Sequence, residues 1–122
     1  MVAGQGAEDS GEVTLPLIAD WPNRPLQKVC FDTGKPALTH WRVLARYPDR
    51  DATRLALRPV TGRTHQLRIH CRQIGHPILG CDLYAPSEIL NRSDRLLLHA
   101  ERLAFNHPCT GLWREFYSPA PF

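Results

Sequence analysis

Residues 38–60 carry the pattern that decides the fold. Residues 38–47 read Leu-Thr-His-Trp-Arg-Val-Leu-Ala-Arg-Tyr, and residues 53–60 read Thr-Arg-Leu-Ala-Leu-Arg-Pro-Val. Apolar and polar side chains alternate along both runs, and a period of two predicts half-buried strands. Between the runs, residues 48–51 are Pro-Asp-Arg-Asp, which is turn material. The two runs therefore predict a β-hairpin.

The basic side chains of this hairpin are expected on one face. Matching the apolar faces of the two strands sets Arg46 near Arg54 and Arg42 near Arg58. Like charges directly opposite each other destabilise a sheet, so such a face is better tolerated when it meets an anion. The alternative is that the arginines extend into water, which costs little.

The charge distribution favours an anionic polymer as partner. The 122 residues suggest one domain at most, and a hydrophobic content of 43% suffices for a core. The window from Arg42 to Arg72 holds eight arginines against two aspartates, a local charge of +6. Arginine presents a planar fork that suits phosphate. An ordinary solvated surface is the alternative.

Outside the hairpin, the elements are short. Thr64 as an N-cap and Gly75 as a stop predict a helix over 64–74, although an extended continuation of the preceding strand is the alternative. Residues 1–12, polar and Gly-rich, are expected to be a flexible lead-in, and 13–36 an extended loop with a short strand near 29–31.

The rest of the chain completes a fold class. A helix-like stretch lies within 85–94, and strands are expected over 96–105 and 113–117. Mostly antiparallel strands with short flanking helices predict an α+β fold.

Several function classes are disfavoured. No apolar run approaches the ~20 residues that span a bilayer, and residues 1–11 lack the basic start and apolar stretch of a secretory signal. We therefore expect a cytoplasmic protein without membrane association. The four cysteines are expected to be free thiols rather than two disulfides. The spacing of histidines and cysteines matches no closed zinc pattern, so no metal is expected.

Four motifs follow one another from Pro59 onward. Residues 59–70 read Pro-Val-Thr-Gly-Arg-Thr-His-Gln-Leu-Arg-Ile-His, and 75–80 read Gly-His-Pro-Ile-Leu-Gly before Tyr84. Arg-Leu-Leu-Leu-His-Ala follows at 95–100, and then His-Pro with a glycine three residues after the proline, at 107–111. Their order and spacing resemble the C-terminal half of RluA-type RNA pseudouridine synthases.

This resemblance implies a fold and an activity. The fold would be the C-terminal part of the pseudouridine synthase fold, with 1–12 as the clipped start of the domain and 13–122 as its C-terminal half. The activity would be isomerisation of uridine to pseudouridine in 23S ribosomal RNA and transfer RNA. It needs neither cofactor nor metal, and the full-length form would be monomeric. An RNA-binding remnant without catalysis is the alternative.

The resemblance also assigns Arg68. In the family an aspartate of an HRLD..TSG motif attacks the nucleoside, and a basic residue of the GRTHQLR element pairs with it. That motif is absent from these 122 residues, so the chain carries no nucleophile of this kind. A carboxylate in a dry pocket needs a fixed cation to stay ionised, and arginine cannot lose its own charge there. The alternative is a surface arginine bound to phosphate.

The remaining candidates are expected to contact RNA. Arg63 would contact phosphate or sugar, and Ile69 would pack against uracil or belong to the core. His65 and Gln66 would contact RNA or fix the local turn. Basic residues of the hairpin complete the expected RNA surface: Arg42, Arg46, Arg54 and Arg58. Where the family has Gly-Asp, this chain reads Gly80-Cys81.

Overall fold

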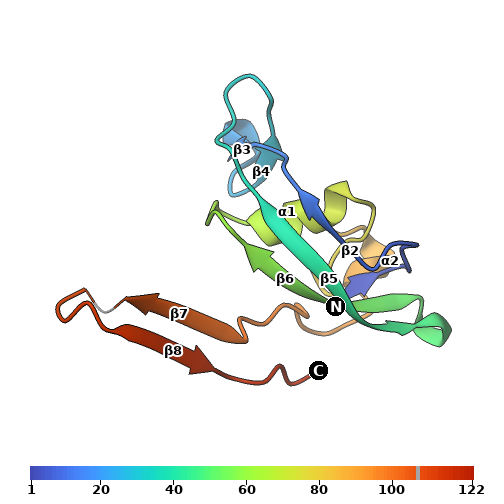
Figure 1. Ribbon diagram of the computed structural model, residues 1–122. Coiled ribbons are helices and arrows are strands. Elements are labelled where there is room, and N and C mark those ends of the chain that lie inside the picture. The colour runs from blue at the N-terminus through green and yellow to red at the C-terminus, as the bar shows by residue number, and fades with distance from the viewer. Residues whose placement is uncertain (107) are drawn as a thin grey trace.

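The predicted hairpin forms the centre of the largest sheet (Figure 1). The structure, a computed structural model, describes residues 1–106 and 108–122, and the side chains of residues 104–106 lie outside that description. The strands are β1 (Val2–Ala3), β2 (Ser10–Val13), β3 (Leu17–Ala19), β4 (Gln27–Val29), β5 (Thr39–Tyr47), β6 (Ala52–Pro59), β7 (Arg102–Asn106) and β8 (Trp113–Tyr117). The helices are α1 (Gln66–Gln73) and α2 (Ser87–Leu90), with 3-10 turns at Trp21–Asn23 and Pro48–Arg50.

The described strands pair antiparallel throughout. One sheet has the order β1-β6-β5-β2, and β3-β4 and β7-β8 form separate two-stranded sheets. With two short helices, this architecture confirms the predicted α+β class. Strand β8 and the short helix α2 lie where the sequence predicts them, and β4 ends at Val29, where the sequence predicts the short strand to begin.

Residues 1–12 differ from the flexible lead-in that the sequence predicts. They contain β1 and three of the four residues of β2, which pair with β6 and β5. Val2 and Ala3 are buried, and Val2 belongs to the main core cluster. A polar, Gly-rich composition does not reveal that β1 has a strand partner 49 to 51 residues away and β2 one 26 to 32 residues away, and this pairing orders the segment.

Helix α1 covers one face of the β5–β6 hairpin. Its residues Ile69 and Cys71 pack into a buried cluster that includes Leu17, Ile78 and Cys81. Leu55 and Leu57 of β6 pack against the same cluster, so the apolar face predicted for that strand is the face that meets the helix. This packing holds α1 and its basic side chains at a fixed height above the sheet.

A buried polar network fixes the start of α1. The Gln66 side-chain amide donates to the Leu38 carbonyl oxygen and to Thr39 Oγ1, both at 3.0 Å. Its Oε1 accepts from Thr61 Oγ1 at 2.7 Å and from the Arg63 backbone N–H at 3.0 Å. Every position of the amide is therefore used, as a buried polar side chain requires.

His70 extends this network to the segment before β3. Its Nε2 lies 2.9 Å from the Leu15 carbonyl oxygen, an acceptor, so Nε2 carries the proton. Its Nδ1 then accepts from Thr39 Oγ1 at 2.8 Å. Burial lowers the pKa of His70, and the bond to Leu15 opposes that shift in part. The imidazole is neutral because a second proton would remove the acceptor that Thr39 needs.

The β7–β8 hairpin extends away from the rest of the fold (Figure 1). The expected strand over 96–105 begins only at Arg102, because residues 96–100 run beside the core instead. There the Leu97 backbone N–H donates to the Leu79 carbonyl oxygen at 3.0 Å. All five residues of β8 are exposed.

Gly80 and Gly75 offer a matched test of close backbone packing. Both have a left-handed φ, +76° and +86°. A Cβ on Gly80 would overlap the Arg95 carbonyl group, whereas one on Gly75 meets nothing within 4 Å. We expect Gly75→Ala to cost about 1–2 kcal/mol of unfolding free energy, and Gly80→Ala to cost a further ~1–3 kcal/mol. Denaturant titration of both variants measures the difference, and equal losses would contradict the close approach.

His70 predicts an acid-sensitive fold. Its folded pKa lies below the unfolded value of about 6.5. The unfolded chain therefore takes up the proton first, so the contribution to stability is complete above pH 6.5 and is lost as the pH falls below it. Denaturant titrations from pH 7.5 to 5 should show a steeper loss for the native chain than for His70→Gln. The same slope in both would refute this, and His40→Gln, on the opposite sheet face, serves as the control.

Candidate functional site

Four side chains gather where α1 meets the segment ending at Tyr84. Arg68 lies one turn after His65, and Arg72 one turn after Arg68. The Arg72 guanidinium lies 5.3 Å from the centroid of the Tyr84 ring. The charge of Arg68 acts on both His65 and Tyr84. The cluster is basic, with Asp82 as the acidic group that acts on His65.

Arg68 is half-buried and has no acceptor among the residues that the structure describes. Within residues 1–106 and 108–122, no hydrogen bond or ion pair joins its guanidinium to another group. A guanidinium that has lost part of its hydration without gaining an acceptor is suited to receive an anion from outside the described chain. The geometry is thus open to the carboxylate or phosphate partner that the sequence predicts for Arg68.

His65 is held by Tyr84. Its Nδ1 lies 2.6 Å from Tyr84 Oη, and the two rings meet edge to face with centroids 5.4 Å apart. Loss of hydration lowers the pKa of His65, and the charge of Arg68 lowers it further. Tyr84 is 5% exposed, and burial raises the pKa of its hydroxyl group. Both groups are therefore neutral near pH 7, bonded to each other beside Arg68.

The side chains of Gln66, predicted to contact RNA or fix the turn, and of Ile69, predicted to pack against uracil or belong to the core, are both buried. Gln66 is 3% exposed, and its amide is fully used in the network at the start of α1. Ile69 is 0% exposed and packs in the main core with Leu55 and Leu57 alongside. Of the alternatives the sequence leaves open, these positions match fixing the turn for Gln66 and plain core for Ile69.

A bulge in β5 separates the arginines of the hairpin. Arg42 lies opposite Ala56 and His40 opposite Arg58, so the predicted pairing of Arg42 with Arg58 is wrong by two residues. The register then shifts between Val43 and Ala45, which sets Ala45 opposite Arg54. The extra residue moves every later side chain of β5 to the other face of the sheet.

Three of the four arginines share the face away from α1. Arg42 and Arg58 are exposed there, and Arg54 is half-buried. None of them makes a hydrogen bond or ion pair within the described residues. Avoiding direct opposition removes most of the repulsion expected from the sequence. The face is a candidate surface for a polyanion.

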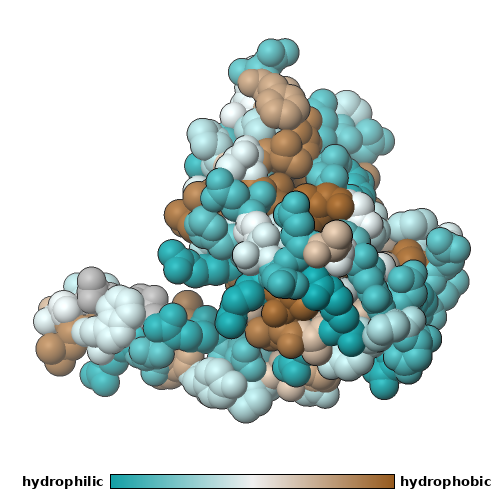
Figure 2. All heavy atoms as spheres, turned by 45° about the vertical axis from the view of Figure 1, so that its right-hand side comes forward, coloured by the Kyte–Doolittle hydropathy of each residue, from teal (hydrophilic) through white to brown (hydrophobic). Residues whose placement is uncertain are grey.

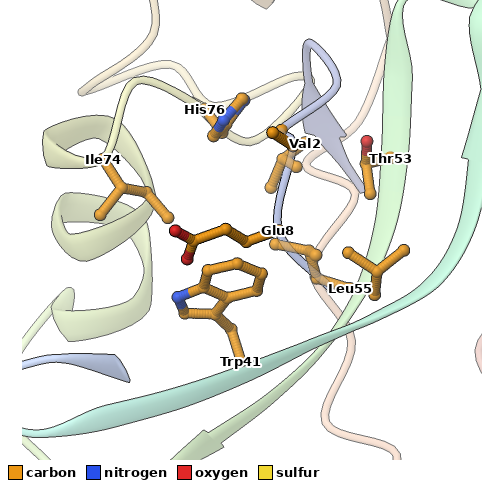
Figure 3. Close-up of a pocket in the computed structure, with 10 residues that line it drawn as sticks. Val2, Glu8, Trp41, Thr53, Leu55, Ile74 and His76 are labelled. Carbon is orange, nitrogen blue, oxygen red and sulfur yellow. The ribbon is translucent and has the colours of Figure 1, made fainter. Parts of the chain in front are cut away.

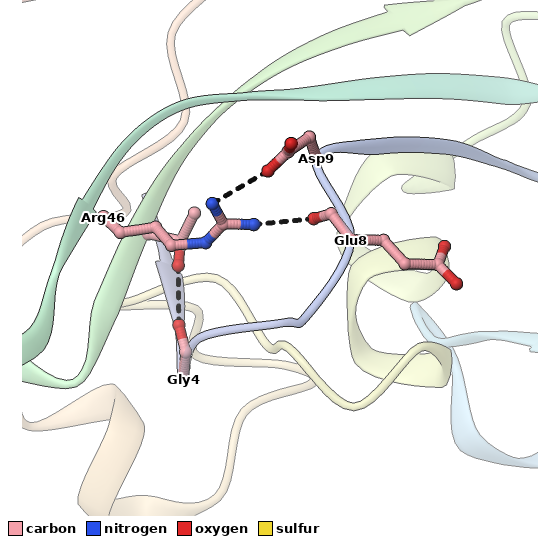
Figure 4. Close-up of polar contacts among 5 residues, drawn as sticks. Gly4, Glu8, Asp9 and Arg46 are labelled. Carbon is pink, nitrogen blue, oxygen red and sulfur yellow. Dashed lines mark hydrogen bonds and ion pairs between the residues drawn. The ribbon is translucent and has the colours of Figure 1, made fainter.

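Arg46 lies on the opposite face, because the bulge turns it toward the N-terminal loop (Figure 4). Its Nη1 pairs with Asp9 Oδ1 at 2.9 Å, and its Nη2 donates to the Glu8 carbonyl oxygen at 2.8 Å. Beside it, Thr53 Oγ1 donates to the Gly4 carbonyl oxygen at 2.8 Å. Arg46 thus fastens residues 8–9 to the sheet, as Thr53 fastens Gly4, and Arg46 does not join the arginine face.

Arg63 is also partly used within the chain. Its Nε donates to the Pro36 carbonyl oxygen at 2.9 Å, and the side chain is half-buried. The bond directs the guanidinium along the surface that links residues 36–38 with the start of α1. The remaining N–H groups can still reach a ligand.

A cavity of about 190 Å³ lies between the end of α1 and the sheet (Figure 3). Trp41 and Leu55 form its sheet side, Ile74 its helix side, and Glu8 reaches across its mouth. None of the residues predicted for the site lines it. The wall of this cavity is mostly apolar and includes one carboxylate, that of Glu8. It lacks the group of hydrogen-bond donors that the Arg68 cluster provides.

The described part of the chain has neither a metal-binding cluster nor a membrane-spanning helix. Within residues 1–106 and 108–122, no three His, Cys, Asp or Glu side chains come close enough to bind a metal ion together. No helix in that part of the chain has the length and apolar character to cross a bilayer. Cys71 and Cys81 lie reduced in the core, and burial raises the pKa of Cys71 to about 12.

Sequence reasoning had no signal for the partnership of Tyr84 with His65. The two residues are 19 positions apart and belong to different motifs. Only the packing of α1 against the segment before Tyr84 brings the hydroxyl group to the imidazole. His107, which belongs to the last of the four motifs, lies outside the described residues.

Comparisons with known proteins agree with the architecture. The family model described as RNA pseudouridylate synthase matches residues 2–73. The chain is 57% identical to the dual-specificity RNA pseudouridine synthase RluA of Pasteurella multocida over its whole length, and 51% identical to that of Escherichia coli K12 over 99% of its length. It covers 55% of each of those proteins. The chain thus spans about half the length of the curated relatives it matches.

A solved structure shares the fold. Human RNA pseudouridylate synthase domain containing 1 superposes with a TM-score of 0.83 at 29% identity, over 99% of this chain and 52% of that one. The antiparallel α+β arrangement expected from the sequence is therefore confirmed, and so is the resemblance carried by its motifs.

Proposed function

The chain belongs to the RNA pseudouridylate synthase family, and from that premise we propose that it forms the C-terminal half of a synthase catalytic domain, with residues 13–122 as its body. The half supplies RNA contacts and the positioning arginine, and an aspartate outside these 122 residues supplies the nucleophile. Alone, the chain is expected to bind RNA without isomerising uridine. We propose that the complete domain acts on ribosomal and transfer RNA in the cytoplasm.

The observation that carries this proposal is the unpaired guanidinium of Arg68. It is half-buried, one helical turn from a neutral histidine, and has no acceptor among the described residues. Burial of a carboxylate at this position costs desolvation free energy, and charge-assisted hydrogen bonds to Arg68 would offset that cost. The carboxylate would stay ionised, as a nucleophile must.

The proposed reaction needs no cofactor. The carboxylate attacks C1′ of the nucleoside, the bond from C1′ to N1 of uracil breaks, and the base rotates. When the bond from C1′ to C5 forms, the bond from C1′ to the carboxylate breaks and the carboxylate is released. C5 then gives up its proton, and N1 gains one. Arg68 holds the carboxylate in place without exchanging a proton, because a guanidinium keeps its protons in proteins.

RNA binding is assigned to the arginine face. Arg42 and Arg58 are exposed, Arg54 stands between them, and no acidic side chain pairs with them in the described chain. Phosphate contacts of this kind position RNA without reading its sequence. The relatives carry the words dual-specificity RNA in their names, which supports action on more than one RNA. We propose 23S ribosomal RNA and transfer RNA as these substrates.

The exposed β7–β8 hairpin supports the assignment to half of a domain. Its residues Leu103, Trp113 and Tyr117 are at least 60% exposed. Figure 2 shows a few hydrophobic residues on the projecting arm among hydrophilic ones. An isolated two-stranded sheet is only marginally stable in water. The missing half of the domain would cover this surface, and the complete domain is proposed to act as a monomer.

A chimera tests the catalytic proposal. This chain would replace the matching segment of the Pasteurella multocida relative, and pseudouridine formation would be measured in a transfer RNA anticodon stem-loop. We expect the chimera to be active and Arg68→Gln to lower kcat by about 10²–10³-fold, the range for loss of a preorganised electrostatic partner. Arg50→Gln, at the exposed turn before β6, should leave kcat unchanged. An inactive chimera, or an active Arg68→Gln variant, would refute the proposal.

The arginine face makes a separate prediction for the 122-residue chain. Arg42→Gln and Arg58→Gln should each weaken binding to an RNA stem-loop and reduce the slope of log K against log salt by about 1. Arg46→Gln should leave both quantities unchanged while lowering the unfolding free energy, because Arg46 bonds to Asp9 and Glu8. Fluorescence anisotropy across a salt series measures the slopes. Equal effects of all three substitutions would contradict the division of the faces.

A further inference from the structure

The backbone at His65 directs its imidazole away from the helix it precedes. His65 has a left-handed φ of 55°, an uncommon conformation for a residue with a side chain, and it makes no side-chain capping bond to α1. The imidazole instead reaches Tyr84, with Nδ1 at 2.6 Å from Oη. His65 thus has a strained backbone and bonds to a residue 19 positions away instead of capping its own helix, which makes it a candidate for a functional role.

The hydrogen bonds of Tyr84 decide which nitrogen of His65 carries the proton. The Gln27 backbone N–H donates to Tyr84 Oη at 3.0 Å, so the oxygen is already an acceptor. The buried hydroxyl hydrogen then has one nearby acceptor among the described residues, Nδ1 of His65. With Nδ1 accepting, the proton of the neutral imidazole resides on Nε2.

The groups around His65 keep it neutral. Desolvation and the charge of Arg68 disfavour the imidazolium, and Asp82 opposes them. Arg72 lies against the ring of Tyr84 on the same side of the helix, which adds further positive charge. His65 therefore presents an uncharged Nε2–H donor one helical turn before Arg68, whose charge acts on it.

We propose that His65 Nε2–H and the Arg68 guanidinium bind the two oxygens of one carboxylate, and that Tyr84 is a positioning residue which fixes the imidazole tautomer. This inference rests on the proposed function, in which the carboxylate comes from the other half of the domain. Both groups only donate, so the ligand must be an acceptor. The site is half-buried, whereas the exposed arginines on the far sheet face suit RNA phosphate, and this difference favours a carboxylate.

The tautomer can be tested on the 122-residue chain itself. Long-range proton–nitrogen correlation spectra of chain labelled with ¹⁵N-histidine, at pH 7, should show the Nε2–H form for His65. Tyr84→Phe should shift this population toward a mixture of both forms, with circular dichroism as the check on folding. An imidazolium or an Nδ1–H form in the native chain would overturn the inference without touching RNA binding or the chimera result.

The ligand class is tested by adding small probes to the same sample. Acetate should shift the resonances of His65 Nε2 and Arg68 Nε together, and His65→Phe should abolish the shift at Arg68. The dinucleotide UpU, as phosphodiester probe, should leave both resonances in place. Shifts produced by UpU and not by acetate would overturn the assignment to a carboxylate.

Kinetics of the chimera distinguish the two levels of proposal. His65→Gln can place an N–H donor near the position of Nε2, so it should keep kcat within a few-fold, whereas His65→Phe should lower it by about 10–100-fold. In His65→Phe the acidic limb of the pH profile of kcat should also move to higher pH, because the carboxylate loses a donor. If the chimera is active and His65→Phe changes neither quantity, the role of His65 falls while the proposed function stands.

Discussion

The hydrogen bonds of Gln66 are the constraint on which the site depends. Its amide joins the start of β5, through Leu38 and Thr39, to the turn that precedes α1. His70 continues the connection to Leu15, so that three separate segments are tied to one helix. Buried polar groups are costly unless all of them are satisfied, and a network in which each is satisfied tolerates one arrangement only. That arrangement sets the height and rotation of α1, and with them the positions of His65 and Arg68.

The division of the hairpin arginines between the two faces of the sheet follows from a single extra residue in β5. Without the bulge near Leu44, Arg46 would lie on the same face as Arg42. The shift in register sends it instead to Asp9 and Glu8, where it holds the N-terminal loop. The same shift leaves a positively charged face, with Arg42, Arg54 and Arg58, to which no acidic side chain of the described residues is paired. The bulge thus assigns Arg46 to holding the N-terminal loop and leaves Arg42, Arg54 and Arg58 on a face that can bind a ligand.

The β7–β8 hairpin and the Arg68 cluster have a common explanation in the relation of this chain to its relatives. The chain matches about half the length of those proteins, and both features lack a complement among the described residues. Exposed aromatic side chains on a two-stranded sheet and a half-buried cation without an acceptor each raise the free energy of an isolated chain. A polypeptide that covers the first and supplies a carboxylate to the second would remove both costs.

The sequence by itself determined the hairpin, the helix, the α+β class and the family. Alternation over 38–60 and the glycine stop at Gly75 are local patterns, and local patterns survive in any tertiary context that buries the apolar face. The order of the four motifs identified the family because each motif is contiguous in the chain.

Only the tertiary structure decided which of the candidate residues are available for function. The hairpin register joins residues 5 to 20 positions apart. The strands β1 and β2 pair with residues 26 to 51 positions away, and Tyr84 is 19 positions from His65. Such contacts depend on packing and on single bulges, and neither leaves a periodic trace in the sequence. Hence residue type suggested seven basic or polar RNA contacts, whereas burial and hydrogen bonding assigned Gln66 to the network that holds α1 and Arg46 to the N-terminal loop.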